Sequence, residues 1–421
     1  MADVQPLTTL RYDLAAVGSL DKVAAPPYDV IDAPLRARLA ARSPFNVVEV
    51  DLPEANGGDP YLHAQTTMEA WLQQGIVTRE REPAIWAMTQ DYTGPDGNSY
   101  TRHGFFCRVR VEDYGPGRIR PHERTQPGPK EDRLRLTRAT RANLSPIFSL
   151  FPDPDGEAWS ALEPVTGSEP YATVRDDDGT VNRLWRIEDP AVHAAVTERL
   201  AGAQLLIADG HHRYETARAF RDEVGGEGPH NYTLMSLTGL DDPGLTVFPT
   251  HRLLSGFADD PERQQRLGNG LRELFEVSEV GREEIDPAGS DGVGVFGFID
   301  SHHKQAFRLR LKDTAELDRL LEGKPEAYRR LDSAILETLV LKGLAGMSDH
   351  DIDERNGLEY AKSVPDALAM VEGGGFDVAF ILRPVPVEQV KAVAETDANM
   401  PPKSTYFFPK VMTGFAFNPV R

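Results

Sequence analysis

The sequence predicts an α/β fold with a mixed sheet, on three observations. Residues 84–111 hold two alternating apolar stretches around a Gly-Pro-Asp-Gly-Asn turn, which is typical of a β-hairpin. Apolar residues 205–208 indicate a buried strand that stops at Asp209-Gly210, and a helical spacing of apolar residues follows from Tyr214. The chain has 421 residues, enough for two or three domains with an ample core.

The first expected segment, residues 1–115, begins with a rigid loop. Pro26 and Pro27 remove backbone donors and fix φ, which excludes a helix or central strand there. Further along we expect a helix over 34–41, a strand over 46–52 and an amphipathic helix over 60–75. The apolar spacing in the last of these predicts four buried side chains, which are Leu62, Met68, Trp71 and Leu72.

The second and third segments, residues 116–255 and 256–421, continue the alternation of helices and strands. For the second we expect a basic helix from 129, strands over 147–151, 205–208, 232–238 and 245–250, a hairpin over 173–188 and a helix over 190–200. For the third we expect helices over 261–274, 314–321, 332–343 and 387–396, a hairpin over 292–311 and a strand over 379–384. The tail at 400–410 carries three consecutive aromatic residues, which predicts that it packs into the core and back toward the site.

Composition excludes several classes of protein. The formal net charge of −20 argues against nonspecific binding of nucleic acid or anionic membranes. No apolar run approaches the ~20 residues of a membrane span, and the N-terminus lacks the pattern of a signal peptide. Cys107 is the single cysteine, so neither an intramolecular disulfide nor a cysteine-based zinc site can form. We expect a cytoplasmic protein.

The segment Asp209-Gly210-His211-His212-Arg213 is the most informative in the chain. A strand that turns through glycine into a helix directs free backbone N–H groups beyond the turn, and the helix dipole favours negative charge there. Two imidazoles and a guanidinium in the same turn predict a phosphate-binding site. The alternative is a structural corner, in which Asp209 caps the helix, Gly210 makes the turn and the basic residues face solvent.

Three further side chains are candidates for the same chemistry. Glu123, beside His122 in a proline-flanked turn, is a candidate general base, which must lie within hydrogen-bond reach of the hydroxyl it deprotonates. The alternative is a capping or salt-bridged pair. Lys130 either neutralises phosphate or faces water. Lys403 is either delivered to the site by the packed tail or lies on a tail whose only role is packing.

Three other motifs are weaker. Residues 292–297 match a dinucleotide fingerprint by letter, but their glycines lie inside an expected strand rather than between a strand and a helix. His302-His303 occupies an expected exposed turn, where adjacent side chains are expected to point apart. Residues 349–353 alternate carboxylates but lack the glycine and closing glutamate of a calcium loop, so a solvated helix start is expected.

Taken together, these motifs resemble a known family, domain-of-unknown-function family 1015, over nearly the whole chain. The shared features are Ala24 with Pro26-Pro27-Tyr28-Asp29-Val30, His122-Glu123, Lys130, Asp132-Arg133, Asn143, Ser145-Pro146, residues 208–217 and Pro402-Lys403-Ser404-Thr405. The family resemblance implies no particular reaction.

The middle segment more distantly resembles the ParB/sulfiredoxin-like superfamily, which includes free serine kinases, sulfiredoxins and CTP-binding ParB proteins. This resemblance implies a central phosphate-binding domain of that type. It places Glu123 where serine kinases of the fold have a catalytic carboxylate, and Asp209 to Arg213 where they bind nucleotide phosphates. The long insertion between these two motifs departs from the superfamily pattern.

These observations favour a small-molecule phosphotransferase that moves a phosphoryl group from a nucleotide or pyrophosphate to a small hydroxyl acceptor such as free serine. Glu123, His211 and His212 would be catalytic. Asp209, Gly210, His211, His212, Arg213, Lys130 and Lys403 would bind phosphate. Mg²⁺ would be held by the donor phosphates and Asp209. The alternatives are a nucleotide-binding regulator or scaffold without turnover, and a phosphoester hydrolase with water as acceptor.

Overall fold

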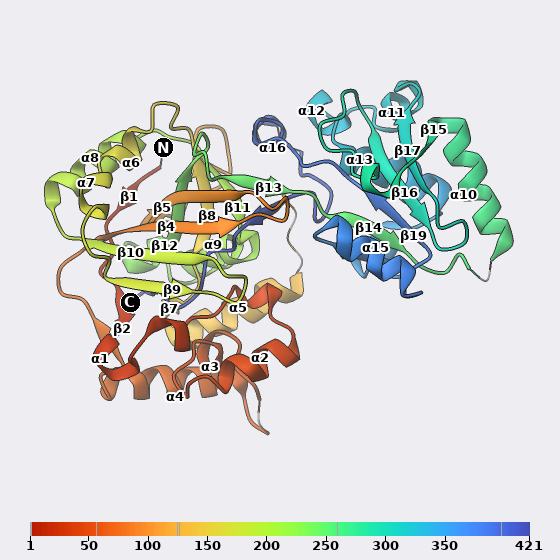
Figure 1. Ribbon diagram of the computed structural model, residues 1–421. Helices are drawn as coiled ribbons and strands as arrows, with labels where there is room; N and C mark the ends of the chain where they lie inside the picture. Colours follow the sequence, from red (N-terminus) through yellow and green to blue (C-terminus); the bar gives the residue numbers. More distant parts are fainter. Residues whose placement is uncertain (1, 56, 124, 126, 259, 397) are drawn as a thin grey trace. The chain divides into compact units, whose positions relative to one another are not determined.

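The computed structural model describes residues 2–55, 57–123, 125, 127–258, 260–396 and 398–421. The described residues form two compact units, coloured along the chain in Figure 1. Unit 1 comprises Met1–Pro121, Thr125–Leu245 and Pro409–Arg421, and unit 2 comprises His122–Arg124 and Thr246–Phe408. The division into 1–115, 116–255 and 256–421 stays a prediction.

Unit 1 is built around a mixed sheet whose strands run in the order β6-β11-β8-β12-β5-β4-β10-β9, with β1 paired to β5. The bounds are β1 Val4–Gln5, β4 Ile85–Thr93, β5 Ser99–Arg110, β6 Ile119–Arg120, β8 Ile147–Phe151, β9 Ala172–Arg175, β10 Val181–Ile187, β11 Leu205–Asp209 and β12 Tyr232–Gly239. β11 is parallel to β6 and antiparallel to β8, and β8 is parallel to β12, so the sheet is mixed as predicted. Short pairs join β2 Leu10–Tyr12 to β3 Val77–Arg79, and β7 Ala142–Asn143 to β21 Asn418–Pro419.

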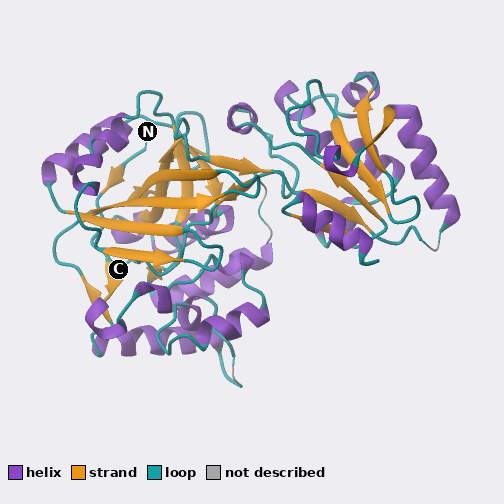
Figure 2. Cartoon of the chain, viewed as in Figure 1, coloured by secondary structure: helices purple, strands orange, loops and turns teal. Residues whose placement is uncertain are grey.

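Helices cover the unit 1 sheet (Figure 2). Their bounds are α1 Leu14–Val17, α2 Ala33–Ala40, α3 Val48–Asp51, α4 Pro60–Gln73, α5 Pro127–Thr140, α6 Glu157–Ser160, α7 Glu163–Thr166, α8 Pro190–Leu200 and α9 His211–Val224. In the core, side chains of the strands pack against apolar residues of α6, α8 and α9, among them Ala158, Val196 and Tyr214. α5 packs against both α4 and α9.

Unit 2 contains an antiparallel sheet in the order β15-β17-β16-β19-β14-β18. Its strands are β14 His251–Leu254, β15 Phe275–Val280, β16 Val295–Asp300, β17 Ala306–Leu311, β18 Leu358–Ala361 and β19 Val378–Ile381, and a separate pair joins β13 Thr246–Phe248 to β20 Tyr406–Phe408. The helices are α10 Pro261–Leu274, α11 Ala315–Leu320, α12 Glu326–Arg329, α13 Asp332–Ile335, α14 Asp349–Asp353, α15 Val364–Glu372 and α16 Val387–Ala394, with a π-helical stretch at Leu336–Leu344. None of the helices among the described residues has the length and hydropathy to cross a membrane.

Two expectations for the first part of the chain are wrong. The strand expected over 46–52 is helix α3, because the amide of buried Asn46 donates to Lys22 O while its Oδ1 accepts from Val48 N, which starts a helical turn. Of the four side chains expected inside α4, Met68 and Trp71 are buried, but Leu62 is 56% exposed and Leu72 is 39% exposed. These two leucines lie outside the buried face of α4, which is narrower than the apolar spacing of the sequence predicts.

The sequence did not predict strands β14 and β15. The four residues after Phe275 in β15 are all exposed and include two glutamates, so this edge strand lacks the alternation that marks a half-buried one.

Of the three weaker motifs, two have the expected structure and one differs from it. Residues 295–297 lie inside β16, and 349–353 form the capped helix α14. His302 and His303 are exposed, but their ring centroids lie 4.8 Å apart, so the expectation that they point apart is wrong.

Candidate functional site

The turn between β11 and α9 requires glycine on two grounds. Gly210 has φ +96°, a conformation that residues with a Cβ rarely adopt. A Cβ at this position would also lie 3.0 Å from Cζ of Arg213. The first helical hydrogen bond of α9 runs from Tyr214 N to Gly210 O, which leaves the preceding N–H groups outside the helical ladder. The predicted strand-glycine-helix turn is therefore present.

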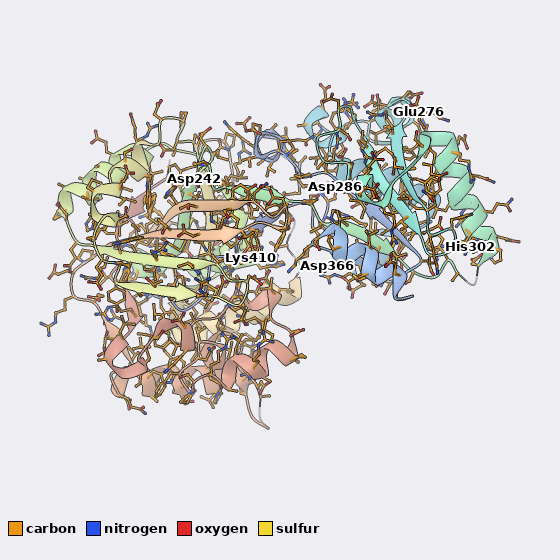
Figure 3. The ribbon with its side chains drawn as sticks, viewed as in Figure 1. Asp242, Glu276, Asp286, His302, Asp366 and Lys410 are labelled. Atoms are coloured by element: carbon orange, nitrogen blue, oxygen red, sulfur yellow. The ribbon has the colours of Figure 1, made fainter. Side chains whose placement is uncertain are left out.

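Asp209 lies between two cations. Nη2 of Arg213 donates to Oδ2 at 2.9 Å, and Nζ of Lys410, labelled in Figure 3, donates to Oδ1 at 3.3 Å. Burial acts to raise the pKa of Asp209, but the positive charges of Lys410 and Arg213, with His211, outweigh it and hold the pKa well below its ordinary value. Asp209 is therefore ionised in the folded protein, and the positive charges of Arg213 and Lys410 balance its negative charge.

Arg213 connects the turn to the two residues that precede β8. Its Nη1 donates to Ser145 Oγ at 3.1 Å and to the carbonyl of Pro146. The N-cap residue of α9 is Gly210 and not Asp209. The alternative in which Asp209 caps the helix is therefore wrong. The guanidinium instead holds Asp209, Ser145 and Pro146 in one arrangement.

A small polar cavity of about 40 Å³ lies beside Arg213. Arg133 of α5 lies over the Tyr28 ring at 4.1 Å and pairs with Asp51 at 3.4 Å. Burial raises the pKa of Asp51, against the opposing effect of Arg133 and Arg213, and burial raises the pKa of Tyr28 to about 12. Since Tyr28, Arg133, Ser145 and Arg213 belong to different sequence motifs, the structure brings four of the motifs to this cavity.

The two histidines and Lys130 lie on the helices that border the same turn. His211 is buried and His212 is partly buried, both in the first turn of α9. Lys130 is partly exposed on α5, and its carbonyl accepts from Thr216 Oγ1 of α9 at 3.4 Å. Lys130 and the turn from Asp209 to Arg213 are thus close together in unit 1.

Glu123 and Lys403 belong to a cluster in unit 2. Nε2 of fully buried His122 lies 4.0 Å from Glu123 Oε1 and 3.0 Å from Thr405 Oγ1. The carbonyl of Lys403 accepts from buried Arg252 at 3.2 Å, while the Lys403 side chain is exposed. Burial lowers the pKa of Arg252, and the negative charge of Glu123 is one of the influences that raise it.

The predicted residues therefore fall into two groups, one per unit. Asp209, Gly210, His211, His212, Arg213 and Lys130 lie in unit 1, whereas Glu123 and Lys403 lie in unit 2. Sequence reasoning missed Lys410 and Asp51. Lys410 follows the aromatic run of the tail in a chain with few lysines, and that scarcity was a usable signal. Asp51 carried no signal, because its neighbours predicted a strand.

Asp209, the predicted Mg²⁺ ligand, is paired with two cations, and its role as a metal ligand stays a prediction. Each of its oxygens accepts from one cation, and each keeps a further lone pair. Among the residues that the structure describes, no group of three or more His, Cys, Asp or Glu side chains could hold a metal ion. The charge of the aspartate is balanced by Arg213 and Lys410.

The fold and this turn define an α/β protein in which a glycine turn joins a buried strand to the start of a helix. The family model described as "Protein of unknown function (DUF1015)" matches residues 4–334, and the chain belongs to this family. None of the curated proteins compared with the chain matches it.

Several solved structures are similar to the chain. A conserved hypothetical protein from Pyrococcus furiosus is 17% identical, with a TM-score of 0.35, over 72% of this chain and 90% of that one. A free serine kinase variant in complex with ADP is 14% identical, with a TM-score of 0.38, over 72% of this chain and 87% of that one. C-terminally truncated SbnI from Staphylococcus aureus is 12% identical, with a TM-score of 0.36, over 73% and 85%.

Proposed function

We propose that the chain is a small-molecule phosphotransferase whose donor phosphates bind at the start of α9. One observation carries this proposal: Asp209, the acidic residue of the turn, is neutralised by both Arg213 and Lys410. The turn with Lys410 therefore has a net positive charge before either histidine binds a proton. Positive charge together with backbone N–H groups at a helix start favours a phosphate.

Each residue of unit 1 has a distinct part in this proposal. His211, His212 and the N–H groups after Gly210 hold the donor phosphates, and Lys130 on the adjacent helix adds positive charge. Arg213 is a positioning residue, because its donors already bind Asp209, Ser145 and Pro146. Such chemistry depends mainly on positioning and charge neutralisation.

In this proposal Glu123 takes the proton from the acceptor hydroxyl, and Lys403 provides an auxiliary phosphate contact. This role for Glu123 is supported by its place beside His122 in a proline-flanked turn, where a carboxylate is a candidate general base.

The proposal also includes a superfamily relationship, a cellular location and a class of partner that the chain does not bind. A distant relationship of residues 116–255 to the ParB/sulfiredoxin-like superfamily rests on the order of the His-Glu and Asp-Gly-His-His-Arg motifs. A cytoplasmic location, where nucleotides are abundant, and the absence of nucleic acid as a partner rest on composition and on the net charge of −20.

The decisive experiment is an acceptor screen with the full chain. Purified protein, Mg²⁺ and a panel of nucleotides or pyrophosphate are incubated with amino acids and polyols, and phosphorylated products are detected by mass spectrometry. Glu123→Gln is expected to bind the nucleotide normally and to lose at least a hundredfold in turnover, the usual scale for a general base. Glu388→Gln, an exposed carboxylate of α16, is the matched control and is expected to keep full turnover.

Other outcomes separate the alternatives. Nucleotide binding without any product, unchanged by Glu123→Gln, would identify a regulator or scaffold. Release of inorganic phosphate that depends on Glu123, with no phosphorylated acceptor, would identify a hydrolase. Unchanged nucleotide affinity in a His211→Ala/His212→Ala double variant would overturn the assignment of the phosphate site.

A further inference from the structure

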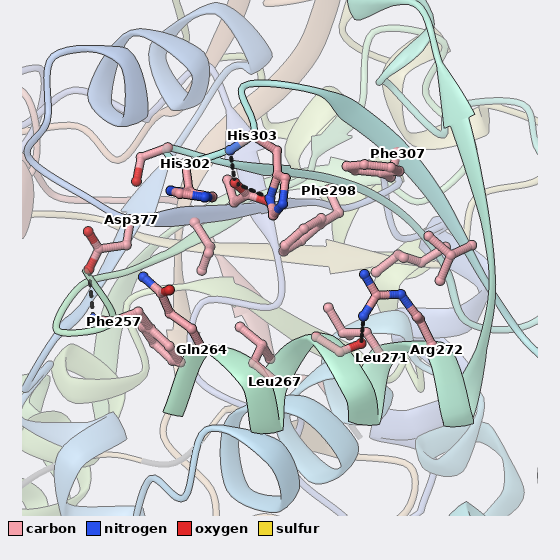
Figure 4. A pocket seen from close by; sticks show the side chains of 16 residues that line it. Phe257, Gln264, Leu267, Leu271, Arg272, Phe298, His302, His303, Phe307 and Asp377 are labelled. Carbon is pink, nitrogen blue, oxygen red and sulfur yellow. Dashed lines mark hydrogen bonds and ion pairs between the residues drawn. The ribbon is translucent and has the colours of Figure 1, made fainter. Parts of the chain in front are cut away.

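Unit 2 contains an apolar cavity of about 230 Å³ between α10 and the sheet. Its walls are aliphatic and aromatic side chains from both sides, which are Leu267, Leu271, Phe298, Phe307, Leu309 and Val378. Figure 4 shows the α10 residues facing the strand residues across this space. A volume of this size accommodates a small organic molecule and is far larger than the share of one water.

A comparison of two glycines in α10 distinguishes this cavity from a packing gap. A Cβ at Gly270 would lie 2.2 Å from Leu344 Cδ2, so close packing accounts for that glycine. Gly268 lines the cavity, and a Cβ there would meet only Arg272 Nη1 at an ordinary 3.5 Å. Glycine weakens a helix interior, yet no neighbour requires it at Gly268. Its effect is to leave the space open.

One end of the cavity is acidic. Asp300 ends β16 and accepts from the backbone N–H of His303 and from its Nδ1 at 3.0 Å. Asp377 uses Oδ2 to accept from Phe257 N at 2.8 Å. Among the described residues, neither carboxylate forms an ion pair with a lysine or an arginine, and Asp377 Oδ1 accepts no hydrogen bond.

The other end of the cavity limits the length of its occupant. Gln264 and Asp377 lie at one end and Arg272 at the other (Figure 4). Gln264 and Arg272 are eight residues apart on α10, which corresponds to roughly 12 Å along the helix. The space therefore suits a compact molecule with one cationic end directed at the carboxylates and an apolar body between Phe298 and Leu267.

We propose that this cavity binds a small apolar primary amine, with the ammonium group at Asp300 and Asp377 and an aromatic or branched aliphatic body between α10 and the sheet. An ammonium group has three donors, which match the two carboxylates and the Gln264 carbonyl. A metal ion is the other cation that carboxylates attract, but the described residues contain no ligand group for one. This site is separate in sequence and chemistry from the phosphate site proposed above.

The test uses three probes of similar shape and different charge on the full chain. Isothermal titration calorimetry measures binding of 2-phenylethylamine, neutral 2-phenylethanol and anionic 3-phenylpropionate. The amine is expected to bind at least tenfold more tightly than the alcohol, and the acid more weakly than both. Equal binding of amine and alcohol, or no binding of any probe, would overturn the proposal.

Two variants locate the binding site. Gly268→Leu fills the cavity and is expected to weaken amine binding at least tenfold, with Gly268→Ala as a smaller step that keeps most of the space. Asp377→Asn keeps an oxygen acceptor for Phe257 N and is expected to weaken the amine tenfold while leaving the alcohol unchanged. If Gly268→Leu fails to fold, Asp377→Asn still decides the question, because unchanged amine affinity in that variant contradicts the proposal.

Discussion

Two cavities, one in each unit, are built on opposite principles. The cavity beside Arg213 in unit 1 measures about 40 Å³ and its buried ions are paired with one another. The cavity under α10 in unit 2 measures about 230 Å³, has apolar walls, and ends at carboxylates that no described lysine or arginine neutralises. The comparison teaches that fixed internal charge organises the first site, whereas the second leaves both space and charge to a ligand.

The largest effect is expected from removing a charge in unit 1. Arg213→Gln removes one of the two cations that pair with Asp209 and breaks the hydrogen bonds to Ser145 and Pro146. We expect a loss of about 3 kcal/mol in the free energy of unfolding, the lower end for breaking a buried ion pair. Urea unfolding followed by tryptophan fluorescence measures it, because all four tryptophans, at 71, 86, 159 and 185, lie in unit 1.

Two comparisons check that charge pairing causes this loss. Arg213→Gln and Asp209→Asn together are expected to cost less than the sum of the two single variants, since each single variant already loses the pair. Arg272→Gln at the unit 2 cavity is the matched control and is expected to change the stability by less than about 0.5 kcal/mol. Equal effects of Arg213→Gln and Arg272→Gln would contradict the contrast between the cavities.

Acid is expected to destabilise unit 2 before the Asp209 cluster. Nδ1 of buried His251 accepts from Leu382 N at 3.2 Å, and burial, with Arg252, lowers the pKa of His251 to about 4. The unfolded chain binds this proton near pH 6.5. The contribution of neutral His251 to the free energy of unfolding is therefore complete above about pH 6.5. It decreases as the pH falls toward 4, by at most about 3 kcal/mol.

Hydrogen exchange read by mass spectrometry resolves this pH effect by unit. Protection of β14 and β19 is expected to decrease between pH 6.5 and 4, after correction for intrinsic exchange rates. The Asp209 pair is expected to persist, since its lowered pKa keeps the carboxylate charged there. His251→Gln, which retains an acceptor but does not titrate, should flatten the unit 2 profile. An unchanged slope in that variant would assign the effect to another group.

The smallest effects are expected at the two glycines of α10. Gly268→Ala should stabilise the chain by about 0.5–1 kcal/mol, because alanine favours a helix interior and nothing crowds its methyl group. Gly270→Ala should destabilise it by about 1 kcal/mol, because its methyl group displaces Leu344. Thermal unfolding of the two variants side by side measures the difference. A loss of stability in Gly268→Ala would show that this glycine has a packing role.

The sequence was most informative where its local pattern determines structure. The strand, glycine and helix at 205–224 are predictable because Gly210 and the apolar spacing act locally. Lys410 was not predictable as a partner of Asp209, because 201 positions separate the two in the chain. The cavity of unit 2 was not predictable from the sequence either. Leu267 and Phe298 follow ordinary core patterns, and no pattern reveals that the space between them is unfilled.

The return of the chain to unit 1 has a consequence for synthesis. Residues 409–421 complete unit 1: Thr413 pairs with Ala25, Asn418 with Asn143, and Lys410 reaches Asp209. All of unit 2 is therefore made before unit 1 has its last strand. Chains grow from the N-terminus, and domains fold as they emerge. A nascent chain thus carries Asp209 without Lys410 until all of unit 2 has been made.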